Sequence, residues 1–109
     1  MTRPISKNEF EELVLNSKLL SLVKFRTEWS GTCQIISPLY KELAANYEDE
    51  VNFFTVDVEK DGELQKEYGV MEIPTILFFK NGKMVDHVKG LTPKQVLAEK
   101  INQALSNTY

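Results

Sequence analysis

An apolar stretch of strand length, LLSLVKFR at residues 19–26, constrains the fold of this chain more than any other segment. Its apolar residues do not alternate with polar ones, a pattern typical of a strand buried on both faces of a sheet. Residues 51–58 predict a second buried strand of the same kind. Two such strands require cover on both sides, and Lys24 is a charged residue flanked by apolar ones within the first of them.

Helical periodicity flanks both strands. Ser6 and Glu9 have the spacing of a reciprocal helix N-cap, and the apolar residues that follow predict a helix over residues 6–17. Between residues 30 and 47, apolar residues recur every three or four positions, which predicts a long helix. Pro38 lies inside this second helix and is expected to kink it.

Two shorter signals predict the remaining helices. Asp61 is a plausible N-cap for a short helix, and Gly69 lies where that helix would end. Thr92 is the expected cap of a terminal helix, with Pro93 at its first position. The apolar face of the terminal helix would consist of Leu97, Ile101 and Leu105.

A hairpin is the clearest local signal in the chain. Asn81 and Gly82 tolerate the positive φ angles of a tight turn, and they separate two strand-like segments, residues 75–80 and 83–88. Pro74 precedes the first of these segments, so it must lie in a turn or at the strand start, where a cis bond after Ile73 is allowed.

These elements follow one another in the order αβαβαββα. A crossover between the two early strands and an antiparallel hairpin later predict an α/β fold with a central mixed β-sheet, flanked by helices on both faces. No linker or repeat divides the chain, so residues 1–109 are expected to form a single domain.

Composition limits the function classes. Thirteen basic and sixteen acidic residues are scattered along the chain, giving a net charge of −3, so no basic stripe for nucleic acid is present. No apolar run approaches the roughly 20 residues of a membrane-spanning helix, and the opening residues lead into no signal-peptide core. We therefore expect a cytoplasmic protein. One cysteine and one histidine exclude an internal disulfide and a structural zinc site, and we expect no metal and no cofactor.

Five segments, in order and suitably spaced, carry a resemblance to a known family. They are WSGTC at residues 29–33, Pro38, Ile73-Pro74-Thr75, FKNG at residues 79–82, and Gly90. Together they resemble thioredoxin over nearly the whole chain. The resemblance implies a thioredoxin-like fold, a cis bond before Pro74, and a surface that binds an extended peptide or protein partner. The residues that would form this surface are Trp29, Gly31, Thr32, Ile73, Pro74 and Gly90.

The active-site motif departs from the family pattern, which is W-C-G-P-C. Ser30 stands where the family has the cysteine that attacks a substrate disulfide, and Cys33 matches the cysteine that resolves the mixed disulfide. A serine hydroxyl is far less acidic than a thiol, so Ser30 is more naturally a helix N-cap than a nucleophile. The only histidine, His87, falls at an expected surface position, which argues against a hydrolase site.

Buried family positions are also changed. The resemblance implies an aspartate at the position of Lys24, a lysine at Thr55 and a tryptophan at Arg26. Lys24 is a candidate modulator of the thiol of Cys33, because a nearby cation favours a thiolate. In the alternative, its ammonium reaches the rim of the strand and pairs with a carboxylate from Glu28, Asp57 or Glu59, and Cys33 is an inert core residue. We also expect a surface pair between Arg26 and Glu59.

Four functions remain open from the sequence. We expect a docking module that binds extended peptides or protein partners without dithiol turnover. The alternatives are a monothiol redox protein that uses Cys33, a protein-disulfide reductase whose first cysteine was replaced by Ser30 through engineering, and a purely structural domain. A monomer is expected, with cross-linking of two chains through Cys33 left open.

Overall fold

The computed structural model describes residues 1–107. The strands are β1 (Thr2–Pro4), β2 (Leu20–Arg26), β3 (Val51–Asp57), β4 (Thr75–Lys80) and β5 (Lys83–Lys89). The helices are α1 (Lys7–Phe10), continued by a π-helical turn η1 (Glu11–Leu15), then α2 (Gly31–Asn46), α3 (Gly62–Glu67) and α4 (Lys94–Ser106).

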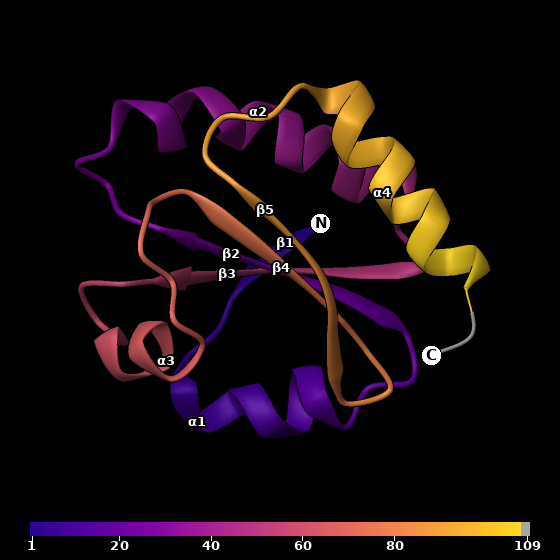
Figure 1. Cartoon of the computed structure of the whole chain (residues 1–109), viewed down its shortest axis with the longest axis horizontal. Coiled ribbons are helices and arrows are strands. Elements are labelled where there is room, and N and C mark those ends of the chain that lie inside the picture. The colour runs from indigo at the N-terminus through magenta and orange to yellow at the C-terminus, as the bar shows by residue number, and fades with distance from the viewer. Residues whose placement is uncertain (108–109) are drawn as a thin grey trace.

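All the strands form one mixed sheet in the order β1-β3-β2-β4-β5. β1 and β2 run parallel to β3, whereas β4 is antiparallel to both β2 and β5. Figure 1 shows the sheet between two helical layers, with α2 and α4 on one side and α1 and α3 on the other. The predicted α/β fold, with a mixed sheet flanked by helices on both faces, is confirmed.

The central strand β2 is buried on both faces, as its sequence predicts. Leu20 and Leu22 pack into the cluster that includes α2 and α4, and Val23 and Phe25 pack into the cluster on the α1 and α3 side. Because side chains alternate along a strand, Lys24 points to the α2 side of the sheet. The central charged residue is thus enclosed between β2 and the long helix.

The first strand was not predicted, so the observed order begins with β1 and the expected αβαβαββα is incomplete. β1 contains three residues and pairs only with Phe53, Phe54 and Thr55 of β3. Its stability comes from this pairing and not from any pattern of its own. Pro4 is acceptable there because β1 is an edge strand, where a missing N–H donor costs little.

The first helix and the start of α4 differ from the predictions, and the start of α3 agrees except for its side-chain cap. The expected helix over residues 6–17 is α-helical only for its first turn and then widens into η1. α4 has Pro93 as its N-cap residue, whereas the Thr92 hydroxyl donates to the carbonyl of Gly90. Asp61 is the N-cap residue of α3, as predicted, but its carboxylate accepts from the backbone N–H of Lys7 and not from the first turn of α3.

Three loops meet at one end of the sheet. The β2–α2 loop follows the carboxyl end of β2, and the antiparallel pairing of β4 and β5 brings the α3–β4 and β5–α4 loops to the same end. Figure 1 shows these loops together on the left of the view. The predicted hairpin closes at the opposite end, where Asn81 and Gly82 have φ values of 55° and 78°.

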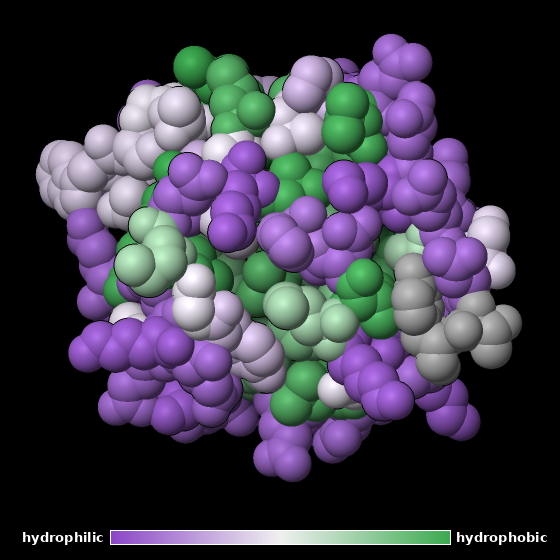
Figure 2. All heavy atoms as spheres, viewed as in Figure 1, coloured by the Kyte–Doolittle hydropathy of each residue, from purple (hydrophilic) through white to green (hydrophobic). Residues whose placement is uncertain are grey.

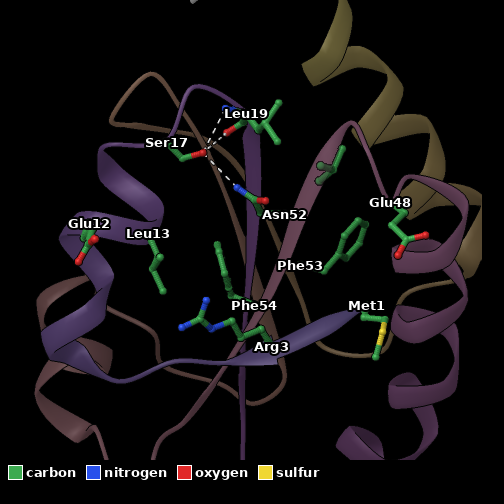
Figure 3. Close-up of a pocket in the computed structure, with 11 residues that line it drawn as sticks. Met1, Arg3, Glu12, Leu13, Ser17, Leu19, Glu48, Asn52, Phe53 and Phe54 are labelled. Carbon is green, nitrogen blue, oxygen red and sulfur yellow. Dashed lines mark hydrogen bonds between the residues drawn. The ribbon is translucent and has the colours of Figure 1, made fainter.

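A cavity of about 510 Å³ lies away from these loops. It follows the outer edge of β3 at its amino end, where the hydroxyl of Ser17 accepts from Asn52 (Figure 3). None of the predicted site residues lines it. Figure 2 shows hydrophilic side chains over much of the visible face, with hydrophobic residues between them and along the upper edge.

The hydroxyl of Tyr40 connects α2 to the sheet, because it lies 3.1 Å from the carbonyl oxygen of Leu22 and 2.8 Å from that of Phe54. We expect Tyr40→Phe to lower the free energy of unfolding by about 1 to 2 kcal/mol, since it leaves buried carbonyls without this donor. The matched control is Tyr47→Phe, which removes an exposed hydroxyl that bonds Asn102. Urea unfolding should show less than about 0.5 kcal/mol for the control. Equal losses would contradict the role of Tyr40.

Candidate functional site

Ser30 begins α2 in the way that the sequence predicts. Its hydroxyl accepts a hydrogen bond from the backbone N–H of Cys33 at 3.2 Å and lies 2.8 Å from the hydroxyl of Thr32. An N-cap side chain satisfies one of the free N–H groups at a helix start. The Ser30 hydroxyl therefore has a structural role, and Gly31 and Thr32 beside it are exposed.

Trp29 precedes the cap and is the most conspicuous side chain of the β2–α2 loop, with 81% of its surface exposed. Its backbone N–H donates to the hydroxyl of Thr27, which in turn donates to Glu59. These contacts hold the loop while leaving the indole in solvent. Such a position makes no contribution to the core.

Cys33 lies in the first turn of α2 and is only 3% exposed. It lines a small cavity of about 170 Å³ together with residues that include Arg26 and Ser37. Cys33 and Ser37 are four residues apart, so they lie on the same face of the helix, the face turned toward β2. The thiol is thus placed between the helix and the central strand.

Lys24 is buried beneath this face, with 2% of its surface exposed. Its ammonium donates to the hydroxyl of Ser37 at 3.1 Å and lies 4.7 Å from the centre of the Tyr40 ring. The expected alternative, in which Lys24 reaches the rim and pairs with Glu28, Asp57 or Glu59, is wrong. The reason is geometric: Lys24 points under α2, where the available partners are a neutral hydroxyl and an aromatic face.

Burial lowers the pKa of Lys24 to about 8 from an ordinary value of 10.5. The electrostatic interaction with Cys33 opposes this shift, and repulsion from Arg26 and Lys41 adds to it. The desolvated ammonium is only weakly compensated, because neither Ser37 nor Tyr40 carries a negative charge. Cys33 is thus part of the electrostatic environment of Lys24.

Arg26 continues along the same face of β2. Its guanidinium lies 3.7 Å from the carboxylate of Asp57, which follows from the register that places these residues side by side. The predicted pair of Arg26 with Glu59 is wrong, because Glu59 accepts from Thr27 instead. The same register places Thr55 beside Lys24.

The loop before β4 supplies the remaining predicted residues. The bond between Ile73 and Pro74 is cis, and the carbonyl of Pro74 accepts from the backbone N–H of Gly90 at 2.7 Å. Gly90 has φ of 74°, a conformation that favours glycine. Within residues 1–107, no hydrogen bond uses the backbone N–H or carbonyl of Ile73.

Two exposed apolar residues beside these positions escaped the sequence interpretation. Met71 is 89% exposed and lies two residues before Ile73, and Leu91 is 52% exposed and follows Gly90. Apolar residues in short loops next to the family motif were the available signal. Their exposure depends on tertiary structure and could not be seen in the pattern.

The histidine that a hydrolase site would need does not line the cavity of Cys33. His87 is exposed on β5, as predicted, and lines a cavity with Tyr68 and Thr75 instead. Among residues 1–107, no three His, Cys, Asp or Glu side chains are grouped so that they could hold a metal ion. In the same part of the chain, no helix is long and apolar enough to cross a membrane.

Comparison with known proteins decides the family. Residues 1–103 match the family model described as Thioredoxin. The chain belongs to the thioredoxin family. The thioredoxin of Staphylococcus aureus is 41% identical over 86 residues, which is 79% of this chain and 83% of that protein. The thioredoxin of Pyropia yezoensis is 34% identical over 102 residues, which is 94% of this chain and 95% of that protein.

The thioredoxin fold is supported independently by a solved structure. The crystal structure of Malassezia sympodialis thioredoxin matches with a TM-score of 0.87 and 30% identity, covering 97% of this chain and 92% of that one. The chloroplastic thioredoxin M-type of Pisum sativum is 35% identical over 99 residues, and this chain spans only 58% of its length. As a member of the thioredoxin family, the chain has a redox-protein scaffold, with Ser30 and Cys33 at the start of α2.

Lys24→Met tests the cost of the buried ammonium in this thioredoxin scaffold. Below about pH 8 the folded state must hold the charge, so the variant should gain stability over the wild type at about pH 7. As the pH rises from about 8 toward 10.5, folded wild type releases the proton that its unfolded state retains, so the wild type becomes more stable. The variant's advantage should shrink by on the order of 2 to 3 kcal/mol.

Urea unfolding at about pH 7 and about pH 10 measures this difference. Lys18→Met is the matched control, since Lys18 is exposed before β2 and its replacement should show no comparable pH dependence. An advantage of Lys24→Met that is the same at both pH values would show that burial does not perturb the lysine.

Proposed function

We propose that this thioredoxin-family protein docks extended segments of protein partners and does not catalyse dithiol turnover. The observation that carries the proposal is an exposed apolar surface around a backbone segment with free hydrogen-bonding groups. We call this the docking surface, and its residues are Trp29, Gly31, Thr32, Met71, Ile73, Gly90 and Leu91, together with Pro74, which is itself buried.

The docking surface exposes large apolar side chains to solvent. Trp29, Met71 and Leu91 are 81%, 89% and 52% exposed, and they come from three loops that meet at one end of the sheet. Exposed apolar side chains gathered at one end of a fold are a common mark of a protein-binding site. These side chains therefore favour a macromolecular partner with apolar groups.

The backbone of Ile73 supplies the directional part of the interaction. Its N–H and carbonyl take no partner within residues 1–107, and it lies directly before Pro74. A peptide in extended conformation can bond to such groups as an added strand, while its side chains contact the apolar residues alongside. The resemblance to thioredoxin supports the same mode of binding.

Dithiol turnover needs two thiols that can form a disulfide with each other. The sequence contains a single cysteine, Cys33, and position 30 carries a serine hydroxyl that caps α2. A hydroxyl cannot form the mixed disulfide through which thiol–disulfide exchange proceeds. Peptide binding, in contrast, requires none of this chemistry, so the docking surface can work without it.

Trp29 provides a direct readout because it is the only tryptophan in the chain. When a panel of tyrosine- and tryptophan-free apolar decapeptides is titrated into the protein, we expect a blue shift of Trp29 emission as peptide covers the indole. Met71→Ser should weaken the binding of a responsive peptide by about tenfold, because it removes an apolar contact. Leu19→Ser is the matched control, since Leu19 is 43% exposed at the far end of β2.

The control variant should bind as the wild type does. Absence of any saturable response across the panel, or an equal loss in Met71→Ser and Leu19→Ser, would overturn the docking proposal. Reduction of a peptide disulfide by the wild-type protein, above the rate of the external reductant alone, would overturn the claim that turnover is absent.

A second candidate function is monothiol redox chemistry at Cys33. It is favoured by one observation: Cys33 interacts electrostatically with Lys24, and it lines a cavity together with Ser37, the hydrogen-bond partner of that lysine. A cation near a thiol promotes thiolate formation, and a thiolate can form a mixed disulfide with an external thiol.

The alkylation rate of Cys33 separates the two functions. Because the thiol is 3% exposed, we expect iodoacetamide to label the folded protein slowly at neutral pH and to label it fully in urea, with intact mass as the readout. Fast labelling of the folded protein, slowed in Lys24→Met, would reverse this expectation and favour the monothiol function.

A further inference from the structure

We infer that a cavity on the α2 side of β2 binds a small oxyanion, a phosphate group carried by a free ion or by a small monoester. The cavity has a volume of about 310 Å³. We call it the cation pocket, and the polar residues that line it are Lys24, Arg26, Lys41, Ser37, Thr55 and Thr2. It is a separate site from the docking surface, and the inference does not rest on the docking proposal.

The charge of the cation pocket is unusual for an acidic protein. The chain carries a net charge of −3, yet the residues that line the pocket include three cations and, within the described chain, no carboxylate. Lys24 and Arg26 come from β2, and Lys41 comes from α2. Cations from separate elements around one cavity produce a positive electrostatic potential, which attracts an anion.

Lys24 gives the pocket a buried donor with unused capacity. An ammonium has three N–H donors, and here one of them donates to the hydroxyl of Ser37 while the Tyr40 ring lies 4.7 Å away. No carboxylate pairs with Lys24 within residues 1–107. Burying a charged group without a counter-charge is unfavourable, and a bound anion would supply that counter-charge.

Arg26 also retains donors. Its guanidinium lies 3.7 Å from Asp57, which is an ion pair beyond hydrogen-bonding distance. The planar fork of an arginine can therefore turn toward an oxyanion, and arginine and lysine are the usual partners of phosphate. Asp57 reduces the net positive charge near the pocket but does not line it.

Hydroxyl groups complete the donor set. Ser37 lies one turn before Lys41 on α2, and Thr55 lies beside Lys24 in the register of β2 and β3. Thr2 on β1 adds a hydroxyl from the edge of the sheet. A tetrahedral oxyanion presents acceptors in several directions, which suits donors that come from a helix and three strands, whereas a planar carboxylate would leave several of them unused.

Titration of inorganic phosphate, followed by the backbone amide spectrum of the ¹⁵N-labelled protein, tests the inference. We expect saturable shifts centred on Ser37, Lys41 and Thr55, together with a higher thermal midpoint. Sodium chloride and sodium acetate at matched ionic strength should not reproduce them. The same titration with phenyl phosphate distinguishes the sources: tighter binding of the monoester identifies a small phosphorylated molecule, and equal binding identifies free phosphate.

Lys41→Gln removes an exposed cation with little risk to the fold and should weaken phosphate binding by about tenfold. Lys24→Met should abolish the saturable shifts. The matched control is Lys18→Gln, an exposed lysine at the other end of β2, which should bind as the wild type does. Shifts that chloride reproduces, or equal weakening by Lys41→Gln and Lys18→Gln, would show general screening and overturn the inference. Failure of peptide docking would leave these results unaffected.

Discussion

The enclosure of β2 is the constraint on which the rest of the structure depends. Its apolar residues alternate between two cores, so helices must cover the sheet on both sides. Every polar group along this strand must then find a partner inside the protein. Lys24 is the extreme case, because the enclosure that stabilises Leu22 and Phe25 also removes its ammonium from water. The contacts between β2 and α2 follow from these two opposed effects, the burial of apolar side chains and the desolvation of the Lys24 ammonium.

The partners of α2 show how these opposed effects are accommodated. Tyr40 joins the helix to the carbonyls of β2 and β3, and Ser37 accepts from Lys24. Together these contacts set the rotation of the helix and thereby place Cys33 on the buried face. The cap by Ser30 fixes where the helix begins. The position of the thiol is therefore a consequence of packing and capping, whatever chemistry the thiol performs.

The sequence predicted those features that are local or strongly patterned. The buried strands, the hairpin turn at Asn81 and Gly82, and the cap at Ser30 each depend on neighbouring residues alone. β1 was missed because a three-residue edge strand exists only through its pairing with β3. The predicted partner of Lys24 was wrong because a carboxylate was expected, whereas in the tertiary structure the ammonium contacts a hydroxyl and an aromatic ring. Exposure of Met71 and Leu91 likewise depends on how loops meet.

The two proposed sites, the docking surface and the cation pocket, make different demands on the scaffold. The docking surface uses exposed loops and an open backbone segment, so it needs no charge in the interior. The cation pocket uses the interior charge itself, with Lys24 and Thr55 side by side in the sheet. The thioredoxin resemblance implies an opposite charge at Lys24, next to the resolving thiol. Under the two proposals, a cation at this position stands where the resemblance implies a proton-handling acid, and the same cation supplies positive charge to the cation pocket.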